Sequence, residues 1–142
     1  MVSKMMTKEA EADFLKGIKN CPIETAFEFI GKKWAILILR DLFRGKRKFR
    51  EFLEANPELS GKVLSQRLKE LEEDGLIKKK IVSKTPLKAK YKLTEKGNNL
   101  DRVLYEIIMY SMKNYTKTVF QDPSKFDEHT CSTIVKNSLT MK

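Results

Sequence analysis

The sequence predicts a mainly α-helical fold that carries one small β-hairpin. Over most of the chain, apolar residues recur every three or four positions, which is the spacing of a helix that buries one face. Between about residues 76 and 93 they instead alternate with lysines, as in a strand. A length of 142 residues corresponds to about one domain, and a hydrophobic share of 41% is enough for one modest core and an interface.

Two helices are expected before residue 31. The first spans residues 7–17 and is followed closely by Ile18, which extends the apolar side formed around Phe14. The second begins at Pro22, because proline at the first helical position loses no hydrogen bond. It ends at Gly31, a residue that commonly terminates helices.

The next three helices have the order of a helix-turn-helix. A helix over residues 33–44 is apolar around most of its circumference, so it must be buried on more than one side. A short helix over residues 48–55 is followed by a turn at residues 56–59. Ser60 is a good N-cap for the amphipathic helix that we expect over residues 61–74.

Two strands and a long helix complete the pattern. The strands cover residues 76–83 and 89–93, and Thr94 then caps a helix over residues 95–119. This order is that of a winged helix-turn-helix, with the hairpin as the wing and a long C-terminal dimerisation helix. The predicted segments are an N-terminal helix (1–19), the winged helix-turn-helix domain (20–94), the long helix (95–120) and a loose tail or short helix (121–142).

The charge indicates a polyanionic partner. Lys and Arg number 29 against 19 Asp and Glu, and a formal net charge of +10 is typical of proteins that bind nucleic acid or an acidic membrane surface. The positive charge is concentrated, since residues 32–50 hold eight basic side chains and one acid, and residues 78–92 hold seven lysines and no acid. Two separated basic stretches predict two places that contact phosphate.

Other classes of protein are disfavoured. The longest purely apolar run, residues 35–39, is far too short to cross a membrane, and the N-terminus lacks the pattern of a secretory signal, so we expect a cytoplasmic location. Two cysteines cannot build a disulfide framework, and the single His129 has no partners for a metal site. We therefore expect no metal, no cofactor and no enzymatic activity. Trp34 has the spacing of a core anchor rather than of a ligand-stacking residue.

The outer face of the helix over residues 61–74 is the candidate reading surface. Its leucines mark the core side, and polar or basic side chains lie opposite them. In this motif the second helix enters the major groove, where Gln66 can pair with adenine and Lys62 or Lys69 can reach guanine or phosphate. The alternative is an ordinary solvated helix face. The candidate residues are Ser60, Lys62, Ser65, Gln66, Arg67 and Lys69.

The hairpin and the loop after residue 45 form the second candidate contact surface. Lysine also discourages edge strands from pairing, so a solvated edge is the alternative interpretation. Seven lysines without an acid exceed what that role requires, which favours phosphate contact. The candidate residues are Lys46, Lys48, Lys80, Lys84, Lys88 and Lys90.

Several motifs resemble one known family. They are CPIE from Cys21, IGKKW from Ile30, LILRDL from Leu37, KFREF from Lys48, LSQRLKELEEDGL from Leu64 and YKLTEKG from Tyr91. Over about residues 20–100 the chain thereby resembles HxlR-type regulators, which are relatives of the MarR-type proteins. The resemblance implies a dimeric winged-helix repressor or activator that binds inverted-repeat operators. In some members, a cysteine at the position of Cys21 senses electrophiles, quinones or oxidants.

The residues themselves also predict a homodimer. A helix over residues 95–119 is too long for one small core to cover, so we expect it to pack against a second copy. The two reading helices would then lie about one DNA turn apart, roughly 34 Å, on a palindromic double-stranded operator. The candidate interface residues are Phe14, Ile18, Leu100, Val103, Leu104, Ile107 and Ile108.

Two questions stay open at the level of the sequence. Cys21 lies at the start of a predicted helix, whose dipole favours an anionic thiolate, but a cysteine is also often a small buried hydrophobe. The chain is either a sequence-specific regulator or an architectural or protein-binding winged-helix protein that coats DNA without specificity. Gln66 and Ser65 favour the regulator, because coating DNA requires no base-reading amide.

Overall fold

The computed structural model describes residues 6–140. The first five positions of the predicted segment 1–19 and the last two of the predicted tail therefore lie outside the described residues. In chain order the elements are α1 (Lys8–Lys16), α2 (Pro22–Ile30), α3 (Lys33–Phe43), α4 (Phe49–Ala55), α5 (Gly61–Glu73), β1 (Ile77–Lys84), β2 (Leu87–Leu93), α6 (Glu95–Asn98), α7 (Asp101–Asn114), α8 (Thr116–Val119), η1 (Pro123–Lys125) and α9 (Glu128–Thr140). The predicted fold class, mainly helical with one β-hairpin wing, is confirmed.

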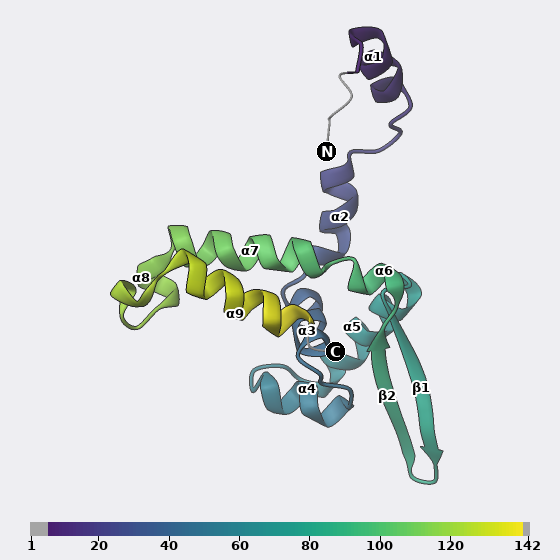
Figure 1. The fold of residues 1–142 in the computed structure, drawn as a ribbon. Helices are drawn as coiled ribbons and strands as arrows, with labels where there is room; N and C mark the ends of the chain where they lie inside the picture. The colour runs from purple at the N-terminus through teal and green to yellow at the C-terminus, as the bar shows by residue number, and fades with distance from the viewer. Residues whose placement is uncertain (1–5, 141–142) are drawn as a thin grey trace.

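The elements extend in three directions from the helix-turn-helix (Figure 1). The helices α3, α4 and α5 lie at the centre, α1 and α2 project upward, and the hairpin projects to the lower right. The helices α7 and α9 run side by side to the left, in opposite directions. The hairpin and the N-terminal helices therefore lie at opposite ends of the molecule.

The core forms where α3 is enclosed by the elements around it. Ile38 and Leu42 of α3 are completely buried together with Phe52 of α4 and Leu64 of α5. Trp34 is partly buried and packs against this core, with the Lys33 ammonium 4.7 Å from the centre of its ring. The tryptophan therefore serves as the core anchor that its spacing predicts.

Local signals set the ends of α5. The Ser60 hydroxyl accepts a hydrogen bond of 3.2 Å from the Val63 amide, which satisfies one of the free amides at the helix start. At the other end, Gly75 has a φ of +74°, a conformation that side chains other than glycine rarely adopt. The chain can therefore leave α5 and enter β1 without strain.

A buried polar cluster holds the turn between α4 and α5. Asp41 of α3 is 1% exposed and accepts hydrogen bonds from Arg40 Nε at 3.0 Å and from Asn56 Nδ2 at 2.7 Å. Arg40 also donates to the Asn56 side-chain oxygen at 3.0 Å, which closes a triangle of three side chains. Because Asn56 ends α4, this triangle fixes the position of the turn relative to α3.

The prediction of one continuous helix over residues 95–119 is wrong. The segment forms α6, α7 and α8, with breaks at residues 99–100 and at Tyr115. The first break arises because α6 is tied to the base of the wing, where Thr94 Oγ1 donates to the Gly75 carbonyl at 2.6 Å and Lys96 Nζ donates to the Asp74 carbonyl at 2.6 Å. Gly97 also lies so close to the Leu76 carbonyl that a β-carbon would overlap it. The chain must turn before α7 can pack near α3.

The tail is more ordered than the sequence suggests. We expected a loose tail or a short helix, whereas α9 is a helix of 13 residues that packs along α7 and contacts α3. Its buried residues are Cys131, Val135 and Leu139, which recur every four positions along one face. The Tyr105 hydroxyl and the Ser132 hydroxyl, 2.7 Å apart, join the two helices by a hydrogen bond.

The burial of α7 corrects part of the predicted dimer interface. Leu100 and Leu104 are 8% and 4% exposed and belong to the core of the single chain, so they are not free to contact a partner. Val103 and Ile107 are exposed, and Ile108 is partly buried. The prediction for Leu100 and Leu104 is wrong because the chain's own core covers that face of α7.

Candidate nucleic-acid interface

The outer face of α5 is open along its whole length. Ser60, Lys62, Ser65, Gln66 and Lys69 are all exposed, whereas the leucines on the opposite face are buried. The exposed hydroxyl, amide and ammonium groups lie in the first two turns and a half of the helix, where a recognition helix contacts base edges. The structure therefore presents these five candidates together on one surface.

Arg67 is placed differently from the other candidates on α5. Its side chain is 22% exposed, and Nη1 donates to both carboxylate oxygens of Glu70 at 3.1 and 3.2 Å. The guanidinium thus lies beside the outer face, paired with Glu70 one turn further along the same helix. From the sequence alone, a basic residue on the predicted recognition helix could either contact DNA or pair with an acid of the same helix.

Glu70 connects the outer face of α5 to the rest of the domain. Its carboxylate accepts from Lys32 Nζ at 3.2 Å and from Gln66 Nε2 at 3.4 Å, in addition to Arg67. Burial alone would raise the pKa of Glu70, but the hydrogen bond from Lys32 and the charge of Arg67 together hold that pKa below its usual value. An anionic Glu70 therefore links the corner between α2 and α3 to the amide of Gln66.

The hairpin is an antiparallel pair with lysines along both strands. Its register pairs Ile77 with Leu93 and Lys80 with Lys90, and it shifts between Ile81 and Ser83. All the candidate lysines of the loop and the wing are exposed, namely Lys46, Lys48, Lys80, Lys84, Lys88 and Lys90. The positive charge of this surface is therefore free to meet an anionic partner.

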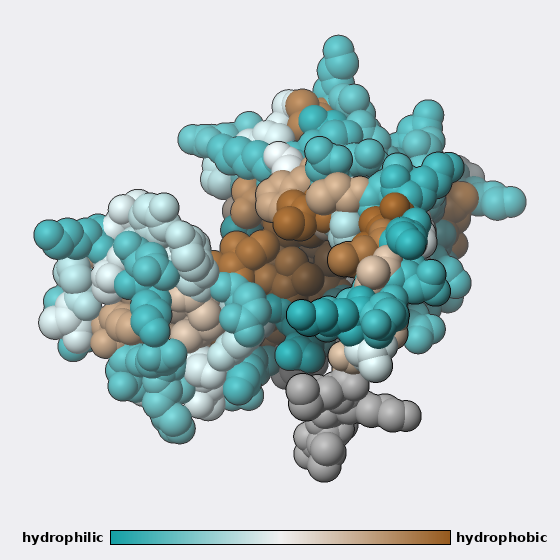
Figure 2. Space-filling view, turned by 90° about the horizontal axis from the view of Figure 1, so that it is seen from above, coloured by the Kyte–Doolittle hydropathy of each residue, from teal (hydrophilic) through white to brown (hydrophobic). Residues whose placement is uncertain are grey.

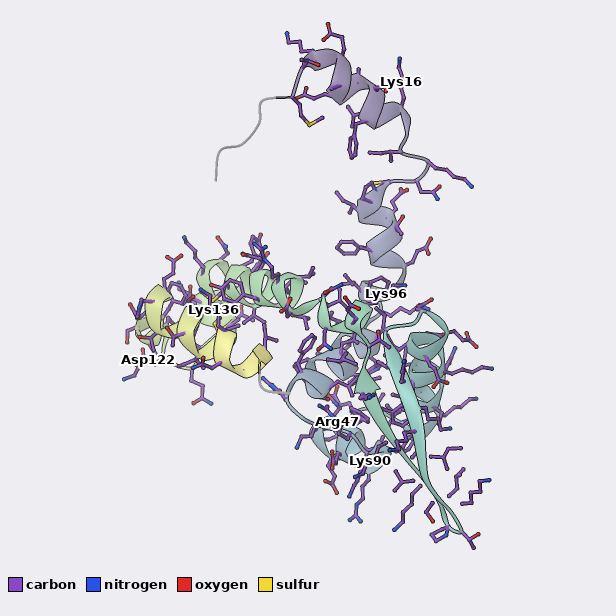
Figure 3. The ribbon with its side chains drawn as sticks, turned by 45° about the vertical axis from the view of Figure 1, so that its right-hand side comes forward. Lys16, Arg47, Lys90, Lys96, Asp122 and Lys136 are labelled. Atoms are coloured by element: carbon purple, nitrogen blue, oxygen red, sulfur yellow. The ribbon has the colours of Figure 1, made fainter. Side chains whose placement is uncertain are left out.

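The loop after α3 is fastened to the hairpin. Lys48 forms a β-bridge with Lys90, and the Tyr91 amide donates to the Arg47 carbonyl at 2.8 Å. Figure 3 shows the labelled Arg47 and Lys90 near each other, where α4 meets the hairpin. The loop thus serves as a third, very short strand that fixes the angle of the wing.

Arg47 in the loop and Glu51 in α4 hold this loop in place, and neither role was predicted from the sequence. The Arg47 guanidinium donates to the Leu42 and Lys46 carbonyls, both at 2.8 Å, and so it closes the loop rather than pointing outward. Glu51 Oε2 accepts from the amides of Arg47 at 2.8 Å and Lys48 at 3.4 Å, and the Arg47 amide is the main cause that holds the pKa of Glu51 low. A glutamate three residues after a helix start is a known capping signal that identifies Glu51. Nothing local distinguishes Arg47 from its basic neighbours.

Cys21 occupies an accessible position at the start of α2. It is exposed and is the N-cap residue directly before Pro22. Its carbonyl accepts from the Thr25 hydroxyl at 2.9 Å, which leaves the thiol outside this hydrogen bond. The second cysteine, Cys131, is buried in α9.

Exposed apolar side chains gather at the end of the molecule opposite the wing. Seen from above, hydrophobic residues line a hollow at the centre of the upper face (Figure 2). In α1, α2 and α7, the large exposed apolar residues are Phe14, Leu15 and Ile18 in and after α1, Ile23 and Phe27 of α2, and Val103, Ile107 and Tyr110 of α7. None of the residues described in α1 and α2 is fully buried. Neighbouring exposed apolar groups of this size are typical of a protein–protein interface.

No helix within residues 6–140 combines the length and the hydropathy needed to cross a membrane. Within the same range, no three His, Cys, Asp or Glu side chains lie close enough together to hold a metal ion.

The fold and the exposed α5 surface define a winged helix-turn-helix DNA-binding protein. The sequence model of the HxlR-like helix-turn-helix family matches residues 29–119, and the chain belongs to that family. It is therefore a transcriptional regulator of the helix-turn-helix type. The match ends before α9, so the last helix lies outside the matched segment.

Three relatives illustrate the similarity. The chain is 41% identical over 108 residues to YvaP, an uncharacterized HTH-type transcriptional regulator of Bacillus subtilis, and this match covers 75% of the chain and 94% of YvaP. The reduced form of the regulator YodB from B. subtilis is 39% identical with a TM-score of 0.59, covering 66% of the chain and 93% of YodB. The oxidized form of the redox regulator HypR is 30% identical with a TM-score of 0.60, covering 66% and 96%. YodB has also been solved after diamide treatment and with a quinone bound.

Proposed function

We propose that this regulator binds a palindromic operator as a homodimer and reads its sequence with the outer face of α5. The observation that carries this proposal is the exposure of Gln66 among hydroxyl and ammonium groups on α5, next to a wing without acidic residues between positions 78 and 92. A glutamine amide can form two hydrogen bonds with adenine in the major groove, while the ammonium groups reach phosphate or guanine. A protein that only coated DNA would not need the amide.

The proposed dimer rests on the apolar hollow between the N-terminal helices and α7. Val103, Ile107 and Tyr110 form one stripe, because they follow one another at intervals of four and three residues along α7. Phe27 and Ile23 of α2 extend the apolar surface toward α1. A second copy is the occupant that we propose, since a two-fold axis through this surface places both α5 helices on the side away from it.

The test of the reading face is the variant Gln66→Ala. If the amide makes two hydrogen bonds with a base, its removal lowers operator affinity by about 1–3 kcal/mol and reduces discrimination at one base pair of each half-site. The operator is first obtained by selection from random DNA with the wild-type chain, and affinities are then measured on that DNA and on a scrambled duplex. Gln121→Ala, which truncates an exposed glutamine far from α5, is the matched control.

The result also separates the two functions that the sequence leaves open. A wild-type chain that binds the selected and the scrambled duplex equally would be an architectural protein. Selective binding that Gln66→Ala leaves unchanged would show that the bases are read by other residues.

We further propose that Cys21 couples oxidants or electrophiles to DNA binding. The thiol is exposed at the N-terminus of α2, and α2 carries part of the proposed dimer surface, so a modified Cys21 would change how the two copies meet. Relatives support this role, because HypR is described as a redox regulator and YodB has been solved with a quinone bound.

The corresponding prediction is that diamide or a quinone changes operator affinity of the wild type and not of Cys21→Ser. Cys131→Ser is the control for the second thiol, which is buried and should react slowly. Operator binding by fluorescence anisotropy, before and after treatment, measures the effect. Equal responses of the wild type and Cys21→Ser would assign the signal, if there is one, to another part of the protein.

A further inference from the structure

The side-chain amide of Gln66 is tied at one end. Its Nε2 donates to Glu70 Oε1 at 3.4 Å, one helical turn further along α5. An ionised carboxylate has no hydrogen to donate, so only the NH₂ group of the amide can face it. The amide oxygen of Gln66 therefore points away from Glu70, on a residue that is exposed at the outer face of the helix.

Glu70 is itself held in place by two cations. Lys32 Nζ donates to its Oε2 at 3.2 Å from the corner between α2 and α3, and Arg67 Nη1 donates to both of its oxygens. Its side chain is only 29% exposed. Burial opposes ionisation of Glu70, but Lys32 and Arg67 hold its pKa below the ordinary value, so the group is an anion at neutral pH. Glu70 therefore presents a fixed acceptor to Gln66.

An amide tied in this way matches one purine better than the other. In the major groove, adenine offers a donor at N6 and an acceptor at N7, whereas guanine offers two acceptors, O6 and N7. Gln66 gives one amide hydrogen to Glu70 and keeps the other hydrogen and the oxygen for a base. One donor beside one acceptor pairs with both groups of adenine, but it places an oxygen against one acceptor of guanine.

We propose that Glu70 is a positioning residue for base selection, which orients the Gln66 amide so that α5 reads adenine and rejects guanine. The inference rests on the proposed function and deepens it, because it identifies the residue that fixes what Gln66 reads. Without this acceptor, the amide is free to turn over and point both of its hydrogens at guanine. Glu70 needs no contact with DNA in this role.

The variant Glu70→Gln tests the orientation of the amide. It keeps the shape of the side chain, but the new amide both donates and accepts, so it no longer fixes one orientation of Gln66. The base pair to examine is the one at which Gln66→Ala loses discrimination on the selected operator. There the wild type should bind adenine about tenfold more tightly than guanine, and Glu70→Gln should reduce this ratio to about twofold or less.

Two variants control for charge and for structure. Glu73→Gln removes the same charge from α5 at a residue that is 64% exposed and pairs with Lys69, and it should leave the ratio unchanged. Lys32→Gln breaks the link to the corner between α2 and α3 but leaves the carboxylate beside Gln66. It should keep the preference for adenine, even if its affinity for both duplexes falls. A merely structural role of Glu70 would instead make Lys32→Gln lose the preference as Glu70→Gln does, which would overturn the proposal.

A double-mutant cycle tests whether Glu70 acts through Gln66. In the Gln66→Ala background, Glu70→Gln should leave the ratio of adenine to guanine affinity unchanged, because no amide remains to be oriented. A further change of this ratio in that background would show that Glu70 affects the base by another route, and the proposal would be wrong.

The outcomes separate this inference from the proposed function. If the wild type binds the selected and the scrambled duplex equally, or if Gln66→Ala relaxes no position, the proposed reading by Gln66 fails and this inference fails with it. If Gln66→Ala relaxes one position but Glu70→Gln matches Glu73→Gln there, only the role of Glu70 is overturned. A preference that depends on Gln66 but selects a base other than adenine also overturns it.

Discussion

Replacing Ile107 by glutamate is expected to dissociate the proposed dimer into monomers. Ile107 is 43% exposed in the single chain, so its replacement leaves the core of one copy intact. At a two-fold interface the substitution would bury two unpaired carboxylates, and we expect the dissociation constant of the dimer to rise by about 100-fold or more. Sedimentation at several protein concentrations measures this change. Operator affinity should fall in parallel, because a monomer contacts only one half-site.

The matched control for this experiment is Ile134→Glu. Ile134 is 61% exposed on α9 and lies outside the stripe on α7, so it receives the same chemical change away from the proposed interface. It should remain dimeric. Dissociation by Ile134→Glu with a stable Ile107→Glu dimer would place the interface on α9 instead.

Removing the carboxylate of Asp41 is expected to lower the free energy of unfolding by about 3 kcal/mol. In Asp41→Ala, the buried amide of Asn56 loses its 2.7 Å acceptor and the Arg40 guanidinium loses its counter-charge. Unpaired polar groups in a dry core are costly, because water cannot replace the lost partner. Urea unfolding followed by circular dichroism measures the effect, with all variants compared at one protein concentration because the proposed dimerisation would add to stability.

Glu54→Ala is the control for the Asp41 experiment. Glu54 also pairs with an arginine, but both partners are largely exposed, so the expected loss is at most about 1 kcal/mol. A similar, small loss for both variants would contradict a structural role of the Asp41 cluster. We also expect Asp41→Ala to weaken operator binding, because Asn56 holds the turn that positions α5.

The sequence alone determined those features whose causes are local. Ser60 satisfies a free amide at the start of α5, and Pro22 lacks only an amide that would have no partner at the start of α2. Gly75 adopts the positive φ with which the chain leaves α5. The periodicity of the leucines likewise predicted which face of α5 is buried and which is free. These signals were sufficient for the fold class and for most of the candidate reading face.

The tertiary structure decided everything that depends on residues distant in the sequence. The helix predicted after Thr94 is broken because its first turn is tied to Gly75 and Leu76, and no residue inside the helix signals that constraint. The core partners of Leu100 and Leu104 come from other elements, so periodicity could not tell an interface residue from a core residue. Lys32 and Glu70, which are 38 positions apart, form an ion pair because packing brings α5 against the corner between α2 and α3, and nothing in the local sequence of either residue signals this contact. Short-range hydrogen bonding can be deduced from neighbouring residues, whereas the choice between solvent, core and partner depends on the whole fold.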